Sequence, residues 1–205
     1  MFKRIVTFFC AIILLCGTAL AAVRPGLTIT KGEPKKPVVA VLYQNHAQLK
    51  YNKAVDKKVM KNFRECLPAS RFVMDEGKTL REKLSENGIE DVYTAERSDV
   101  IYALEGENVD YVVFLELQNF DRKEKSSWLT HGIEMKTQAP FKIIDVKREK
   151  YLYSGKIVVK ADSTTPIGNV GNRGVVMEAV DKINERVAKI LGEKLEGMNT
   201  VKSEK

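Results

Sequence analysis

Few residues of this chain have the types and spacing that catalysis or metal binding requires. The chain contains two histidines, His46 and His131, and no His-x-x-x-His or Cys-x-x-Cys pair, so the ligand spacing of ordinary zinc sites is absent. Cys66 and His131 would form a thiol–imidazole pair if the fold brought them together, but Cys66 lies on the apolar stripe of a predicted helix, which favours a packing role. No Gly-x-Ser-x-Gly or Ser-x-x-Lys arrangement occurs. We therefore predict no catalytic, metal-binding or cofactor-binding residue.

Carboxylates are numerous, and one of them stands apart. Several occur together in predicted turns and helix ends, where charges are solvated: Asp75-Glu76, Glu90-Asp91, and Glu105 with Glu107. Glu116 lies in a buried apolar run and is the one acid whose pKa the fold could perturb, although an exposed position on the sheet is the simpler expectation. A glycosidase would need two carboxylates roughly 5–10 Å apart across a cleft, and the sequence alone does not identify such a pair.

A glycine-rich segment, Gly168–Gly174 (GNVGNRG), lies between a predicted strand and a predicted helix, where phosphate-binding loops lie. Its glycines are spaced G-x-x-G-x-x-G and lack the Gly-Lys-Ser/Thr ending of a P-loop. We interpret the wider segment Asp162–Gly174 as a surface loop. A partner contact through Arg173 is the alternative to a purely connecting role.

Two surfaces are candidates for contact with a partner. The first is the polar segment Asn119–Gly132, which contains the only tryptophan, Trp128, together with His131. An exposed tryptophan is costly unless a partner covers it, and the alternative is a side chain folded back onto the sheet edge. The second is a basic ridge on a predicted helix, with residues recurring every three or four positions: Lys53, Lys57, Lys61 and Arg64. This ridge is either a solvated helix face or a surface for anionic lipid or glycan.

A central strand is predicted over Tyr111–Leu117, where β-branched and aromatic residues dominate a short apolar run. The length and composition suit a strand that is buried on both faces. Residues 133–143 alternate apolar and polar side chains, as in a strand with one face on the core, and the phase then breaks, which predicts a bulge near Ile143. Tyr151–Ala161 resumes the alternation after a charged turn over residues 147–150, which predicts an antiparallel hairpin.

Helical spacing and breakers complete the order of elements. The predicted helices are Asn52–Leu67, Gly77–Gly88, a short helix capped by Ser98 and ended by Gly106, and Val175–Leu195. Two further strands are predicted over Pro37–Tyr43 and Arg71–Met74. The order β-α-β-α-α-β-β-β-α predicts an α/β (α+β) fold, with a single mixed sheet of about five strands and helices packed on it.

Residues 1–22 have the features of a secretory signal peptide. A positively charged start precedes an apolar core, and small residues predict cleavage after Ala21 or Ala22. An uncleaved anchor is the alternative, because the uncharged stretch approaches the ~20 residues that span a bilayer. The lipoprotein interpretation is disfavoured because Leu15, rather than a small residue, precedes Cys16. We expect export to the periplasm or the envelope.

Removal of this peptide leaves 183 of the 205 residues, enough for one domain and short for two. Residues 23–36 are rich in breakers and predict a linker, residues 37–196 predict a single α/β domain, and residues 197–205 predict a flexible tail. Loss of Lys3 and Arg4 lowers the formal net charge from +7 to +5, a mild excess typical of mixed-sign surfaces. Nucleic acid is not an expected partner. The one remaining cysteine forms no internal disulfide, which leaves packing or an intermolecular bridge.

The strands carry a resemblance to a known group of envelope domains. Pro37–Leu42 (PVVAVL) precedes a helix, Val109–Val113 (VDYVV) is similar to the group's "aDyvv" strand, and Phe141–Val146 (FKIIDV) is similar to its "lrlidv" strand. With the final helix from Val175, the chain resembles the proteins grouped around the curli-secretion component CsgG, the amino-terminal domain of TolB and the penicillin-binding-protein activator lipoproteins. The resemblance covers most of residues 37–195.

This resemblance implies a non-enzymatic accessory protein that docks to a larger protein partner of the cell envelope, and it carries over no catalytic residue. We therefore expect an exported binding or assembly module whose loops make the contacts. Two alternatives stay open. One is a periplasmic hydrolase that acts on cell-wall material, and the other is a homo-oligomer that forms a ring or a secretion-accessory component.

Overall fold

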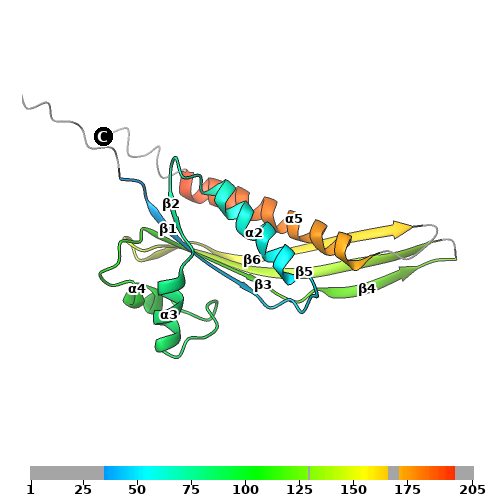
Figure 1. Ribbon diagram of the computed structural model, residues 1–205, viewed down its shortest axis with the longest axis horizontal. Helices are drawn as coiled ribbons and strands as arrows, with labels where there is room; N and C mark the ends of the chain where they lie inside the picture. Colours follow the sequence, from blue (N-terminus) through cyan, green and yellow to red (C-terminus); the bar gives the residue numbers. More distant parts are fainter. Residues whose placement is uncertain (1–34, 129, 166–170, 197–205) are drawn as a thin grey trace, which may run out of the picture. The chain divides into compact units, whose positions relative to one another are not determined.

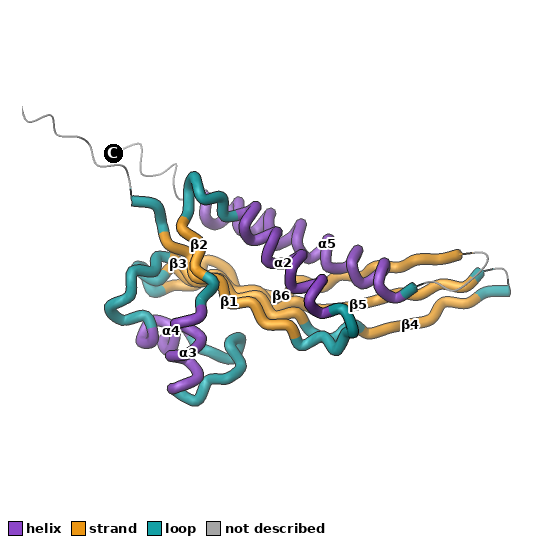
Figure 2. The backbone as a smooth tube through the Cα atoms, in the orientation of Figure 1, coloured by secondary structure: helices purple, strands orange, loops and turns teal. Residues whose placement is uncertain are grey.

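The computed structural model describes residues 35–128, 130–165 and 171–196. They form one mixed sheet of six strands with four helices packed on it (Figures 1 and 2). The single mixed sheet predicted from the sequence is confirmed, with one strand more than expected. The signal peptide with Ala21 and Ala22, nearly all of the linker, and the tail lie outside the described residues, so those predictions stay predictions.

The bounds of the elements are as follows. The strands are β1 (Val38–Asn45), β2 (Val73–Asp75), β3 (Tyr111–Leu117), β4 (Asp121–Ser126), β5 (His131–Asp145) and β6 (Lys150–Thr165). The helices are α2 (Asn52–Cys66), α3 (Lys78–Glu86), α4 (Arg97–Ala103) and α5 (Asn172–Leu191), and a short π-helix, η1 (Gly192–Glu196), follows α5.

The predicted central strand is β3. The strand order is β2-β1-β3-β5-β4, with β1, β2 and β3 parallel and the others antiparallel. Residues Val112–Leu117 are buried, as expected for a strand covered on both faces. The long strand β5 pairs along one edge with both β3 and β4, and along its other edge with β6. A register shift between Ile143 and Ile144 confirms the predicted bulge.

The two faces of the sheet are covered by different helices. α2 and α5 pack on one face, over a core that includes Val113 and Phe141. α3 and α4 pack on the other face, over a smaller core that includes Leu42, Phe114 and Ile144 (Figure 1). This smaller core takes its strand residues from β1, β3 and the end of β5, so no helix among the described residues covers the far half of the β5–β6 hairpin on that face. No helix among the described residues is both long and apolar enough to cross a membrane.

Asp110 joins the start of β1 to the start of β3. The Val38 N–H donates to Asp110 Oδ2 at 2.8 Å, and the Asp110 N–H donates to the Val38 carbonyl at 2.9 Å. The Val146 N–H donates to the Asp110 carbonyl at 3.0 Å, which ties in the end of β5, and Lys147 forms an ion pair with the carboxylate. One residue of the VDYVV motif therefore fixes the relative positions of three strands.

Helix α2 follows its sequence pattern. Val55, Val59 and Phe63 are buried on the stripe that faces the core, and the helix ends before Pro68. Cys66 is half-buried and packs against the same core. Burial raises the pKa of the Cys66 thiol, and the neighbouring Glu65 charge raises it further.

The Cys66 thiol should therefore react slowly while the protein is folded. At pH 8 we expect iodoacetamide to modify Cys66 several-fold more slowly in the native protein than in urea, because less thiolate is present and access is reduced. Peptide mass spectrometry would follow the Cys66 peptide, with glutathione as a control for the effect of urea on the reagent. Equal rates in the two states would contradict the half-buried position.

Three sequence predictions are wrong in detail. The sequence predicts a loop over Asn119–Gly132, but this segment contains β4. Charged side chains lie on both faces of the strand, and backbone pairing with β5 holds it in place. The cap of α4 is Glu96 rather than Ser98, because Glu96 and Asp99 form a reciprocal capping box. Helix α5 begins at Asn172, three residues before the predicted start.

The loop predicted over Asp162–Gly174 is shorter than expected. β6 continues to Thr165, and Arg173 belongs to the first turn of α5. Residues 166–170, which include Gly168, lie outside the described residues.

Candidate functional site

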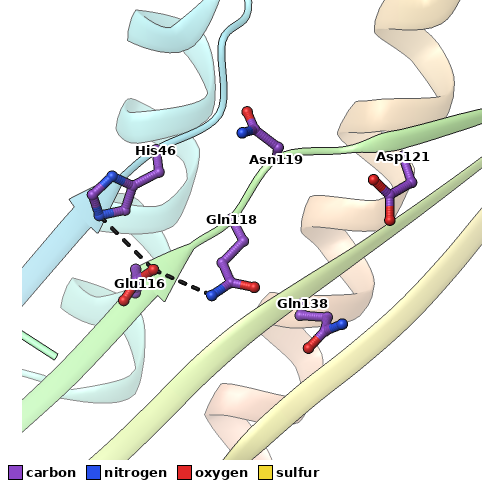
Figure 3. A pocket seen from close by; sticks show the side chains of 6 residues that line it. All are labelled: His46, Glu116, Gln118, Asn119, Asp121 and Gln138. Carbon is purple, nitrogen blue, oxygen red and sulfur yellow. Dashed lines mark hydrogen bonds and ion pairs between the residues drawn. The ribbon is translucent and has the colours of Figure 1, made fainter. Parts of the chain in front are cut away.

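A polar pocket lies beside the carboxyl ends of β1 and β3. Its volume is about 320 Å³, and its lining consists of polar side chains from five segments (Figure 3): His46, Glu116, Gln118, Asn119, Asp121 and Gln138. Glu116 shares the sheet face of Val112 and Phe114, on the side of α3 and α4, because alternate residues of a strand point the same way.

Glu116 corrects a sequence expectation. An exposed position was predicted, whereas the residue is only 8% exposed. His46 Nε2 lies 3.8 Å from Glu116 Oε1, and Gln118 Nε2 donates to the same oxygen at 3.4 Å (Figure 3). Both distances exceed those of strong charge-assisted hydrogen bonds, so His46 and Gln118 compensate the buried carboxylate only weakly.

Lys142 comes near the carboxylate but bonds elsewhere. Its Nζ donates to the Tyr93 carbonyl at 2.6 Å and to the Ala95 carbonyl at 3.4 Å, and it lies 4.1 Å from the centre of the Tyr93 ring. Burial lowers the pKa of Lys142, while the charges of Asp91, Glu96 and Glu116 act in the opposite direction. The ammonium thus anchors the loop between α3 and α4 to the sheet.

This loop brings a second carboxylate to the pocket. Ligand atoms of His46, Asp91 and Glu116 all lie within 4.8 Å of one another. The Asp91 carboxylate is oriented by the Tyr93 N–H, which donates to Oδ1 at 3.0 Å. The three residues come from three separate segments, so no local spacing in the sequence indicated the cluster. One imidazole and two carboxylates are donors that a divalent metal ion can use.

The β4–β5 connection is a second candidate site. Trp128 lies in it and is 91% exposed, so the side chain does not fold back onto the sheet. The connection is shaped by a hydrogen bond from the Ser127 N–H to the Thr130 carbonyl at 2.8 Å and by a 2.8 Å contact between the two hydroxyls. His131 is exposed as the first residue of β5, so the structure brings Trp128 and His131 to the same end of the sheet.

Arg173 and the basic ridge lie on helices instead. The Arg173 guanidinium is 5.8 Å from the centre of the Tyr51 ring, which links the starts of α5 and α2. The ridge residues are exposed on α2, as predicted: Lys53, Lys57, Lys61 and Arg64. Lys61 pairs with Glu65 at 3.5 Å and Arg64 pairs with Glu76 at 2.9 Å, so acids offset half of the charge of the ridge. A lipid or glycan contact at the ridge stays a prediction.

No protein-family model matches the chain, and no curated protein matches it in sequence. Several solved structures have a similar fold. A neuraminyllactose-binding hemagglutinin homologue from Helicobacter pylori is 16% identical with a TM-score of 0.51, and the match covers 84% of this chain and 93% of that one. The carboxyl-terminal domain of LpoB from Salmonella enterica is 15% identical with a TM-score of 0.35, covering 62% and 85%. TolB from Acinetobacter baumannii is 13% identical with a TM-score of 0.38, covering 80% of this chain and 29% of TolB.

The likeness to the Helicobacter protein extends over nearly the whole of both chains and identifies a shared fold. At these identities the comparison concerns the fold, and the residues of a working site have to be sought in this chain itself.

Proposed function

We propose that this protein is an exported accessory module of the cell envelope that docks to a larger protein partner through the β4–β5 connection. The observation that carries the proposal is the 91% exposure of Trp128 in a connection whose backbone is held by hydrogen bonds. Tryptophan is among the residues most enriched in the energetic centres of interfaces. Hydrogen bonds between Ser127 and Thr130 preorganise the two sides of the connection, and preorganisation lowers the entropy lost on binding.

The scaffold supports this use of the connection. β5 runs without interruption from His131 to Asp145, where it pairs with β3 in the middle of the sheet. The exposed tryptophan is therefore carried by a strand that belongs to the core. The strand motifs, the predicted export and the fold neighbours agree with an envelope protein that acts by binding.

Crosslinking in intact envelopes, followed by affinity purification, would test the docking role. We expect Trp128→Ala to reduce recovery of the crosslinked partner at least tenfold, because a central aromatic contact contributes about 2 kcal/mol or more to binding. Tyr102→Ala is the matched control, since Tyr102 is 70% exposed on α4 and lies outside the proposed surface. Its recovery should equal that of the unchanged protein.

The two variants should have the same melting temperature as the unchanged protein, because both side chains are exposed. The docking proposal fails if Trp128→Ala retains the same partner at the same yield, or if Tyr102→Ala loses it equally. Size-exclusion chromatography of the purified protein would test the homo-oligomer alternative, which a monomer alone would contradict.

A hydrolase that acts on cell-wall material is the second candidate. The observation in its favour is the polar pocket, whose lining includes the carboxylates of Glu116 and Asp121. Release of soluble fragments from purified cell wall would test it, with Glu116→Gln as the variant that removes the buried acid. Equal release with the variant, or none with the unchanged protein, would remove this candidate.

A further inference from the structure

We propose that His46, Asp91 and Glu116 form a binding site for one divalent transition-metal ion such as zinc. The site is independent of the docking role and occupies a different part of the sheet from Trp128. Its three donors are one imidazole nitrogen and two carboxylate oxygens, all within 4.8 Å of one another.

Modest side-chain movements would bring the donors to bonding distance of one ion. Tetrahedral zinc lies about 2.0–2.2 Å from nitrogen and oxygen ligands, so two of its ligands are about 3.5 Å apart. The three donors lie within 4.8 Å of one another, so the widest pair has to approach by about 1.3 Å or less. His46 has a side chain that is 42% exposed and Asp91 lies half-buried on a loop, so rotation of these two side chains can make the adjustment around the more buried Glu116.

Glu116 gives a second and independent reason to expect a ligand. The residue is 8% exposed and its side chain is 11% exposed, yet its close contacts within the described residues are the 3.4 Å bond from Gln118 and the 3.8 Å approach of His46. A buried carboxylate ordinarily has a close cation or several short hydrogen bonds, because removing its charge from water is costly. A metal ion in contact with the carboxylate would supply that compensation.

Lys142 compensates these carboxylates only in part. Its charge interacts with those of Asp91 and Glu116, but its ammonium donates to the carbonyls of Tyr93 and Ala95 and faces the Tyr93 ring, and it forms no direct ion pair with either carboxylate within the described residues. Gln44, the register partner of Glu116 on β1, has a side-chain oxygen that is buried without a hydrogen-bond partner in the described structure. A second polar group, on the strand beside Glu116, is therefore unsatisfied within the described residues.

The donor set also indicates which ions should bind. Magnesium and calcium prefer oxygen ligands, whereas an imidazole nitrogen favours zinc and its neighbours in the transition series. Three protein donors leave a coordination position for water or a further ligand. The amides of Gln118 and Gln138 line the adjoining pocket and could hydrogen-bond to such a ligand.

Titration calorimetry of zinc chloride into the purified, chelator-treated protein would test the site. We expect one zinc ion per chain, with affinity at least tenfold weaker in each of His46→Gln, Asp91→Asn and Glu116→Gln. His131→Gln is the matched control, because His131 is the other histidine of the chain and is exposed at the far end of the sheet. It should bind zinc within twofold of the unchanged protein, as should Trp128→Ala.

Thermal melting gives a second readout. At the same concentration, zinc should raise the melting temperature of the unchanged protein and of His131→Gln more than that of Asp91→Asn. This variant keeps the side-chain oxygen that accepts the hydrogen bond from the Tyr93 N–H, so its loop should keep its fold. The proposal is overturned if zinc does not bind in a one-to-one ratio, if His131→Gln weakens binding while His46→Gln does not, or if magnesium chloride binds as tightly as zinc.

Discussion

Replacement of Phe141 by alanine should lower the free energy of unfolding by about 3–5 kcal/mol, because it removes a large apolar side chain from a closely packed core. Phe141 is fully buried, and its backbone pairs with Leu115 of β3 on one side and with Gly155 of β6 on the other. Its ring lies 5.7 Å, centre to centre, from the ring of Tyr153. The cavity would open where three strands meet under the helices α2 and α5.

Urea unfolding followed by circular dichroism would measure this loss. Val158→Ala is the control on the neighbouring strand, since Val158 is 40% exposed and its truncation should cost about 0.5 kcal/mol or less. A lower urea midpoint with an unchanged slope of unfolding free energy against urea would show that stability changed and that the surface exposed on unfolding did not. A loss below about 1 kcal/mol in Phe141→Ala would contradict the packing of this core.

Asp110→Ala should also destabilise the protein, by about 1–3 kcal/mol, because the Val38 N–H loses its acceptor in a partly buried position. The Asp110 side chain is 12% exposed, so water replaces the lost contact poorly. Asp181→Ala is the matched control. Asp181 is 50% exposed and pairs with Lys58 at 2.6 Å across two helices, and an exposed pair of this kind contributes about 0–1 kcal/mol.

The same unfolding measurement serves both aspartate variants. A larger loss for Asp110→Ala than for Asp181→Ala would show that the aspartate of the VDYVV motif holds β1 and β3 together. Equal losses would mean that the backbone bond from the Asp110 N–H to the Val38 carbonyl positions the strands without the carboxylate.

Elements with a strong side-chain pattern could be predicted from the sequence. β3 is an apolar run, and α2 shows its core stripe at helical spacing, so each carries its own burial pattern. The bulge in β5 was also visible, because the alternation changes phase at Ile144. In these cases the physical cause, burial of one face, acts on residues that are close in the chain.

β4 could not be predicted in this way. Its sequence, DRKEKS, contains no apolar residue, and the strand exists because β5 offers it a row of backbone donors and acceptors. The predicted cap of α4 is wrong for a different reason. Ser98 is a favoured capping residue, but the side chains of Glu96 and Asp99 each accept from the other's backbone N–H at the start of the helix.

The pocket depends on contacts between distant segments. Glu116 is buried where the loop that contains Asp91 and the end of β1 beside His46 lie close to it. The residues next to Glu116 in the sequence do not indicate either contact. Trp128, in contrast, was a candidate from its residue type and its polar neighbourhood. Only the structure could separate an exposed tryptophan from one that folds back.

The long ladder between β5 and β6 has a mechanical consequence. The strands pair from His131 with Thr165 to Asp145 with Lys150, and their hydrogen bonds run perpendicular to the strands. A pull on Trp128 along the strand direction would load many of these bonds together in shear, whereas a sideways pull would open them one after another. If an envelope partner moves relative to this protein, the hairpin can transmit tension along its length into the centre of the sheet.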